Sequence, residues 1–146
     1  MTHLYQQQGV QFVVFSIHGQ LYACYIEEVV EILRVPVITE IPGVHSIIEG
    51  VINLRGNIIP VVNLHKRFQL PQPSSHKKNR IVIVQSRQEY IGLMVEEVKM
   101  VTTFDVNNVE KPSGQHVDEA IFESFAKWDH QVIGILQLEK VLHERG

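Results

Sequence analysis

The second half of this chain repeats the pattern of its first half, and this repeat limits the possible folds more than any other feature. Residues 12–15 (FVVF) correspond to residues 81–84 (IVIV), and the sequence IEEV that follows corresponds to VEEV at the same spacing. Further along, residues 58–64 (IIPVVNL) correspond to residues 132–138 (VIGILQL), and both runs end in an amide and a leucine. Two matches in the same order predict a duplicated β module.

The stretch GVINLRGNIIPVVNL predicts a β-hairpin with a charged tip. Its two apolar runs, residues 50–54 and 58–64, are rich in Val and Ile and flank the polar tip Arg55-Gly56-Asn57. The glycine supplies the positive φ that a tight turn requires. The tip is therefore expected in solvent, where Arg55 either keeps the turn solvated or faces a partner.

Most of the remaining chain is also predicted to form β-strands. It is dense in Val, Ile, Tyr and Phe, with turn signals at residues 18–20, 87–89 and 129–131. Several short strands would leave exposed sheet edges, and closing each sheet on itself removes them. The pattern therefore predicts two small barrels.

Few segments carry a helical pattern. Only residues 136–143 space their apolar side chains as a helix does, and shorter helical turns are considered at residues 42–48 and 66–70. Pro60 interrupts an apolar run. Because proline cannot donate a hydrogen bond to a neighbouring strand, Pro60 predicts a bulge or an edge strand.

The composition is that of one globular domain. The chain has 146 residues, of which 45% are hydrophobic and 20% charged, so it can bury a core. Its net charge of −3 gives no support for binding to nucleic acid. We expect module one at residues 12–70 and module two at residues 81–142. The segment between them, 71–80 (PQPSSHKKNR), is expected to be a solvated link, with an anionic partner for its basic cluster as the alternative.

The sequence also bears on where the protein lies. No apolar run approaches the roughly 20 residues that a membrane-spanning helix needs. The start, MTHLYQQQG, lacks the apolar core of a secretory signal. The single cysteine, Cys24, lies in an apolar run, which predicts a buried thiol and suits a reducing compartment. We therefore expect a cytoplasmic protein that does not insert into the membrane.

Motifs for catalysis are absent from the sequence. It contains no phosphate-binding glycine loop, no dinucleotide-binding motif and no nucleophile elbow. Its eight histidines show no metal-ligand spacing. The pairs Glu27-Glu28 and Glu96-Glu97 are expected at strand ends that meet water, because neighbours on a strand point to opposite faces. The sequence predicts a protein that is not an enzyme and that needs no cofactor or metal.

Three longer stretches carry the pattern of a known family. They are FVVFSIHGQLYACYIEEVVEIL, GVINLRGNIIPVVNL and AKWDHQVIGILQLEKVL, and together they extend from about Phe12 to Leu142. In this order and spacing they resemble the CheW family, the adaptors of bacterial chemosensory arrays. The resemblance implies a mainly β fold of two five-stranded SH3-like barrels that share a core, with a short C-terminal helix. It also implies a non-catalytic adaptor that joins the cytoplasmic tips of methyl-accepting chemoreceptors to the regulatory domain of a sensor histidine kinase.

The tip NLRG, followed by a strand that contains a proline, is the most specific part of the resemblance. It falls on Asn53, Leu54, Arg55 and Gly56, with Arg55 in the position that the family associates with partner binding. A planar guanidinium suits this role, because it can form two oriented hydrogen bonds to a carboxylate. The resemblance therefore assigns Asn53, Arg55 and Gly56 to partner contact.

Two other segments are assigned to partner contact by the resemblance. The family's V-x-E segment falls on Val29 and Glu31, and the wall of the groove that receives the receptor's helical tip falls on Ile81 and Val82. An apolar groove that takes an amphipathic helix is a common mode of recognition. The alternative for Val29, Ile81 and Val82 is that they are core residues of their strands.

Two positions depart from the family pattern. Asn63 stands where an acidic residue is usual and carries no charge for a salt bridge, and His130 stands where a glycine is common. The resemblance does not separate flagellar chemotaxis from pilus motility or second-messenger signalling. Because small barrels host many functions, a stand-alone peptide-binding module is the alternative outside these pathways, with an unrecognised enzyme as the third.

Overall fold

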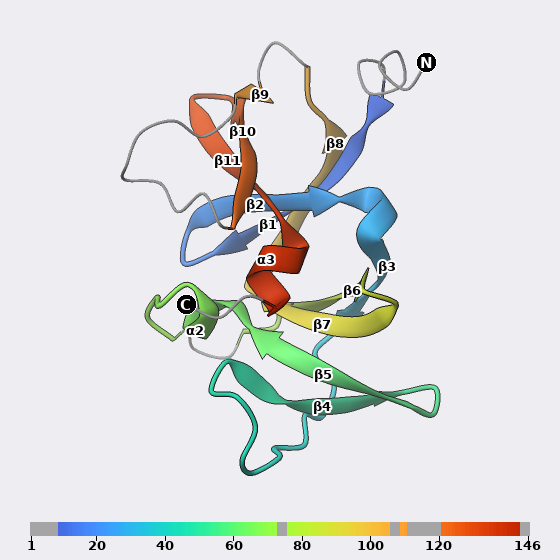
Figure 1. The fold of residues 1–146 in the computed structure, drawn as a ribbon. Coiled ribbons are helices and arrows are strands. Elements are labelled where there is room, and N and C mark those ends of the chain that lie inside the picture. The colour runs from blue at the N-terminus through green and yellow to red at the C-terminus, as the bar shows by residue number, and fades with distance from the viewer. Residues whose placement is uncertain (1–8, 73–75, 106–108, 111–120, 144–146) are drawn as a thin grey trace.

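Two β-sheets, one above the other, form the body of the molecule (Figure 1). This computed structural model describes residues 9–72, 76–105, 109–110 and 121–143. Short helices lie beside the strands, and α3 lies where the two sheets meet. The mainly β fold class expected from the sequence is therefore confirmed.

The first sheet, which we call the six-stranded sheet, combines both ends of the chain. Its strand order is β8-β1-β2-β11-β10-β9, and all pairs are antiparallel except β11 with β2. Its sixth strand, β9, has only two residues, so the expected five strands account for nearly all of it. The strands are β1 (Gln11–Ile17), β2 (Gln20–Tyr25), β8 (Glu97–Thr103), β9 (Val109–Glu110), β10 (Phe122–Trp128) and β11 (Gln131–Leu136).

The second sheet, the five-stranded sheet, has the order β3-β6-β7-β5-β4, with β5 and β7 parallel. Its strands are β3 (Val29–Arg34), β4 (Ile48–Leu54), β5 (Asn57–Asn63), β6 (Arg80–Ser86) and β7 (Glu89–Val95). The helical elements with described bounds are η1 (Ile26–Glu28), α2 (Leu64–Arg67) and α3 (Leu138–His143).

Each half of the chain is divided between the two sheets, because its first two strands lie in one sheet and its remaining strands lie in the other. β3 follows β2 in the chain but pairs with β6 of the other half, and β8 follows β7 but pairs with β1. Each sheet is therefore built from both halves of the sequence. The boundaries of the two modules, residues 12–70 and 81–142, stay a prediction. Strands that follow one another in the chain do not all pair with one another in the sheets.

The pairing register supports the duplication. A register shift leaves Val30 as the extra residue in the pair β3–β6, and Lys99 is the extra residue at the matching position in β8–β1. Likewise, Glu49 is the extra residue of β4–β5 and Glu123 that of β10–β11. Since each bulge bends its strand at an equivalent place, the two halves share their irregularities as well as their apolar runs.

Four hairpins close with two-residue turns in which both residues have positive φ. This geometry matches the twist of the flanking strands, and at these positions side chains other than glycine are strained. Three of the turns lie where the sequence predicted them, and the fourth is the Arg55-Gly56 tip, whose expected third residue, Asn57, begins β5. The turns are His18-Gly19, Arg55-Gly56, Arg87-Gln88 and Asp129-His130.

Buried apolar side chains form one cluster between the sheets and one on the far side of each sheet. The cluster between the sheets includes Phe15, Val82 and Leu93 together with Leu138 and Val141 of α3. The predicted C-terminal helix is thus confirmed and packs into this shared core. The thiol of Cys24 is fully buried in the same cluster, as expected.

Local predictions between residues 42 and 70 were partly right. Residues 42–47 form turns and a bend but no helix. The expected helical turn at 66–70 begins earlier, at Leu64, because the Asn63 side chain accepts a hydrogen bond from the backbone of Lys66 and caps α2. The strand with Pro60 is not an edge strand, but its pairing with β7 begins only at Val61, so no bond to β7 is lost at the proline.

We predict that Gly50→Ala destabilises the five-stranded sheet. A Cβ at this position would lie 2.3 Å from the backbone oxygen of Thr39, which accepts a hydrogen bond from Val51. The connection before β4 would have to move, and overpacking of this kind costs about 1–3 kcal/mol. Urea unfolding measures the loss. Gly9→Ala is the control, since nothing lies within 4 Å of its added carbon, and equal unfolding curves for the two variants would contradict the prediction.

Candidate functional site

Arg55 and Glu31, both assigned to partner contact, are paired with each other. The guanidinium donates from Nη2 to Oε1 at 2.5 Å and from Nη1 to Oε2 at 3.4 Å. Arg55 lies in the turn between β4 and β5, and Glu31 lies on β3, the strand at the opposite edge of the same sheet. The ion pair therefore joins the two edges of the five-stranded sheet.

This ion pair remains accessible to another protein. The exposed fraction is 67% for the Arg55 side chain and 31% for that of Glu31. The hydrogen bond from Arg55 holds the pKa of the Glu31 carboxyl below its usual value, so Glu31 is charged at neutral pH. A partner that approaches here meets a guanidinium with donors left over, already oriented by a carboxylate.

The neighbouring residues of the tip hold the turn in shape. The side-chain oxygen of Asn53 accepts a hydrogen bond from the backbone nitrogen of Gly56 at 2.9 Å. Gly56 has a positive φ and nothing near the place where a Cβ would be. Asn53 and Gly56 thus lie on either side of Leu54 and Arg55, and their hydrogen bond holds the backbone of the turn that carries Arg55.

The structure separates the three apolar residues assigned to the groove. Ile81 and Val82 are fully buried, because β6 lies between β3 and β7 and has core on both faces. Their burial fits the core alternative, and a contact of Ile81 or Val82 with a partner stays a prediction. Val29 is half-buried and packs against the shared core.

Exposed apolar residues next to this core were not singled out in the sequence. On β3, Val30 and Ile32 are 43% and 38% exposed and flank Glu31 along the strand. Ile32 pairs with Val82 in the sheet. It is therefore an exposed residue directly beside one of the two residues that the resemblance assigned to the groove wall. The sequence signal that could have found these exposed residues is the alternation of side chains along a strand. Successive residues of β3 point to opposite faces, and the two faces differ in burial. More exposed apolar residues follow in the connection to β4, namely Val35, Val37, Ile41 and Val44.

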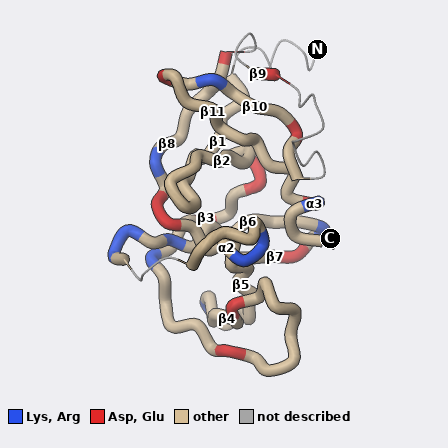
Figure 2. Tube along the Cα trace, turned by 90° about the vertical axis from the view of Figure 1, so that its left-hand side faces the viewer, with Lys and Arg blue, Asp and Glu red and all other residues tan. Residues whose placement is uncertain are grey.

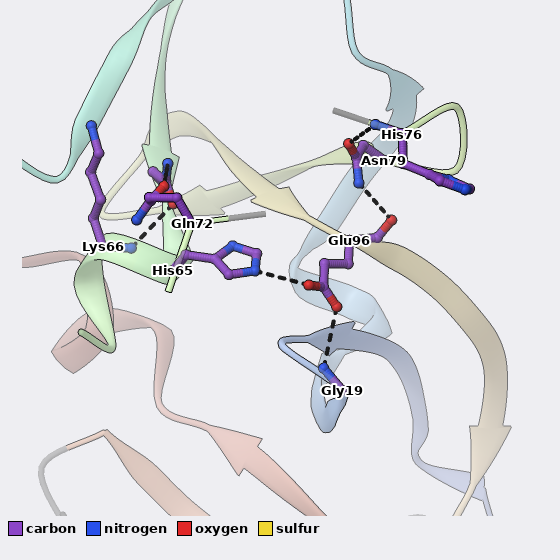
Figure 3. Close-up of polar contacts among 8 residues, drawn as sticks. Gly19, His65, Lys66, Gln72, His76, Asn79 and Glu96 are labelled. Carbon is purple, nitrogen blue, oxygen red and sulfur yellow. Dashed lines mark hydrogen bonds and ion pairs between the residues drawn. The ribbon is translucent and has the colours of Figure 1, made fainter. Parts of the chain in front are cut away.

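A polar cluster ties the link to both sheets (Figure 3). Glu96 accepts from His65 Nε2 at 3.1 Å and from the backbone of Gly19 at 3.3 Å, and its own carbonyl accepts from Asn79 Nδ2. Asn79 in turn accepts from the backbone of His76. Partial burial raises the pKa of Glu96, but the hydrogen bonds that its carboxylate accepts from His65 and from the backbone of Gly19 and His18 outweigh burial and leave the pKa lowered. Glu96 follows the last residue of β7 and is partly exposed, as expected of a strand end, but its carboxylate also bonds to α2 and to the β1–β2 turn.

A second group of carboxylates surrounds η1, the turn that links the two sheets. The expectation that Glu27 and Glu28 end a strand is wrong, because both lie in this 3-10 helix. The Tyr25 hydroxyl donates to Glu123 at 2.7 Å, and the Tyr25 backbone donates to Glu28. Burial, and secondly the carboxylates of Glu123 and Glu27, raise the pKa of Glu28 to about 7, although the Tyr25 bond opposes this. Burial also raises the pKa of the Cys24 thiol to about 12.

The described part of the chain offers neither a metal site nor a membrane-spanning helix. Among these residues, no three His, Cys, Asp or Glu side chains are arranged to hold a metal ion. None of the described helices is long and apolar enough to span a bilayer. The accessible features of the site are therefore an ion pair, a structured turn and apolar side chains, which suit contact with another protein.

Comparisons with known proteins agree with this picture. A family model described as CheW-like domain matches residues 11–146. The chain is 33% identical to chemotaxis protein CheW of Bacillus subtilis over 140 residues, which are 94% of this chain and 90% of that protein. It is 30% identical to Protein PilI of Pseudomonas aeruginosa over 105 residues, 70% of this chain and 59% of that protein. The crystal structure of the scaffolding protein TtCheW from Thermoanaerobacter tengcongensis is similar with a TM-score of 0.85 and 38% identity, covering 94% of both chains.

We predict that Glu28→Gln stabilises the protein at alkaline pH. With its pKa raised to about 7 from the usual 4.5, Glu28 binds a proton more tightly in the folded protein, so stability falls as pH rises between these values. A glutamine stays neutral and can still accept from Tyr25. Because Glu28 is partly exposed, we expect a gain on the order of 1 kcal/mol at pH 8 and none at pH 4.

Thermal unfolding at both pH values measures this difference. Glu40→Gln serves as the control, since that side chain is exposed and is not among the groups that raise the pKa of Glu28. A gain for Glu28→Gln that does not change with pH would show that the charge of Glu28 is not its cause.

Proposed function

This chain belongs to the CheW-like family, and from that premise we propose that it joins the cytoplasmic tips of methyl-accepting chemoreceptors to the regulatory domain of a sensor histidine kinase. The family relationship rests on the match over residues 11–146 and on the similarity to scaffolding protein TtCheW. The protein is a non-enzymatic adaptor of chemosensory signalling.

The observation that carries the proposal is the exposed Arg55–Glu31 pair. A guanidinium on a strained two-residue turn is held in one direction by Glu31, and the Asn53–Gly56 hydrogen bond holds the backbone of that turn. Such preorganisation lowers the entropy lost on binding. We assign this surface, made of Asn53, Arg55 and Gly56 with Glu31, to the kinase.

The apolar face of β3 is our assignment for the receptor. Val30 and Ile32 are exposed on the strand that carries Glu31, and Val29 continues this surface into the shared core. The cytoplasmic tip of a chemoreceptor is helical by the family resemblance, and an amphipathic helix can place apolar side chains on such a surface. The kinase and receptor surfaces then adjoin on one sheet, which allows a change at one partner to affect the other.

The location of the protein follows from these partners. We propose that it lies in the cytoplasm and reaches the inner membrane only through receptor arrays. The described helices offer no membrane span of their own. Co-localisation with receptors that is lost when the receptors are deleted would support this.

The likeness to Protein PilI favours a second candidate, an equivalent coupling role in pilus motility. That match covers a smaller part of both proteins than the match to Bacillus subtilis CheW. We therefore place the chemotaxis role first. Reconstitution with a chemotaxis kinase and receptor, with this protein as the only variable component, separates the two, since the pilus role predicts no receptor-coupled kinase control in that mixture.

We predict that Arg55→Ala weakens kinase binding without unfolding the protein. The variant loses an ion pair, and exposed pairs contribute about 0–1 kcal/mol to stability. Loss of an oriented guanidinium from an interface should lower affinity at least about tenfold. Titration with the purified kinase regulatory domain measures affinity, and thermal unfolding measures stability.

Arg87→Ala is a matched control for this experiment. Arg87 also has positive φ in a two-residue turn, and it forms an exposed ion pair with Glu139 at 3.3 Å. The control loses the same kind of interaction from the other hairpin of the five-stranded sheet. If both variants bind the kinase as the parent does, or if both lose affinity equally, the role assigned to Arg55 is wrong.

A further inference from the structure

A groove of about 900 Å³ lies beside the six-stranded sheet and contains none of the residues assigned to partner contact above. Four segments form its walls: the β1–β2 hairpin, residues 76–79, the start of β8 and the β10–β11 hairpin. In Figure 2 the basic segment before β6 and a basic position on β8 lie on the same side of the molecule. We call this the Trp128 groove, after the largest side chain in it.

The floor of the Trp128 groove is apolar. Leu21 and Met100 line it, and both pack against the buried cluster of the six-stranded sheet. Trp128 is 39% exposed at the end of β10. An exposed indole next to two half-buried aliphatic side chains offers a surface for an apolar anchor.

The repeat explains why this groove is open. Met100 directly follows the bulge residue of β8, as Glu31 directly follows that of β3. Asp129 is the first residue of its two-residue turn, as Arg55 is of the other. In the five-stranded sheet these two positions hold an ion pair that joins the sheet edges. A methionine cannot form that pair. The equivalent place in the six-stranded sheet is therefore left unbridged, with Trp128 beside it.

The rim of the groove has positive charges that share a carboxylate. Glu97 lies 3.2 Å from the ammonium of Lys99 and 4.0 Å from that of Lys78. The second carboxylate of the groove, Glu96, is turned toward His65 and Gly19 (Figure 3). One exposed carboxylate thus balances two ammonium groups, and both lysine side chains remain about half exposed, at 58% and 43%.

From this geometry we propose that the Trp128 groove binds a segment of a partner protein in which an aliphatic side chain stands next to a carboxylate. The aliphatic side chain fills the floor at Met100 and Trp128. The carboxylate lies between Lys78 and Lys99, where it is the second carboxylate beside two ammonium groups that otherwise share Glu97. This surface is separate from the Arg55 surface, so the proposal does not depend on the partners assigned there.

Trp128 makes the proposal directly testable, because it is the only tryptophan of the chain. Its fluorescence reports on the groove without a label. We expect the blocked peptide Gly-Leu-Glu-Leu-Gly to shift the emission of the full-length protein in a saturable way. The peptides with glutamine or lysine in place of glutamate should bind about tenfold more weakly or not at all, because the carboxylate is the group recognised. Added salt should weaken binding of the acidic peptide.

The double substitution K78Q/K99Q tests the two lysines together. It should reduce affinity for the acidic peptide about tenfold, since both ammonium groups are removed. Lys77→Gln is the control, because Lys77 is exposed on the same link but does not line the groove. Unchanged melting curves of both variants show that the fold is retained.

Several results would overturn the proposal. The emission could fail to change with the acidic peptide at millimolar concentration, or the glutamine and lysine peptides could bind equally well. Equal binding by K78Q/K99Q and the parent would exclude the lysines. A shift in emission that depends only on the concentration of the protein itself would assign the groove to a second copy of this chain instead.

Discussion

The division of each half of the chain between the two sheets is the constraint on which the rest of the structure depends. β3 pairs with β6 and β8 pairs with β1, so neither sheet is complete without residues from both halves. The apolar side chains between the sheets then form one core, into which α3 inserts Leu138 and Val141. Because burial of this core requires both sheets at once, the two halves are held in one fixed relation.

A fixed relation between sheets is what an adaptor without chemistry requires. Glu31 belongs to β3, which pairs with a strand of the second half, while its partner Arg55 belongs to a hairpin at the other edge of the same sheet. The pair therefore lies beside the buried cluster of the five-stranded sheet, against which Leu54, the residue before Arg55, packs. Glu96 adds a polar connection between α2, the β1–β2 turn and the link. Contacts made by one partner can thus be passed on through packed elements instead of through a mobile loop.

Duplication also gave the protein two unequal surfaces. The backbone irregularities are repeated, as the bulges at Val30 and Lys99 show. The side chains at the matching positions differ, with Glu31 and Arg55 in one sheet and Met100 and Asp129 in the other. Equivalent backbone positions therefore present an ion pair on one sheet and an open apolar groove on the other. Two different partners can be distinguished by such a difference, since charge and shape both change.

The sequence by itself determined the strands, the hairpin turns, the C-terminal helix and the position of Arg55 at a solvated tip, because these depend on alternation and turn chemistry within a few residues. The tertiary structure alone decided which strands are neighbours. That choice buried Ile81 and Val82, exposed Val30 and Ile32, and brought Arg55 to Glu31 and Glu96 to His65. Pairing of distant strands is set by the summed burial of the whole core, so no short stretch of sequence records it.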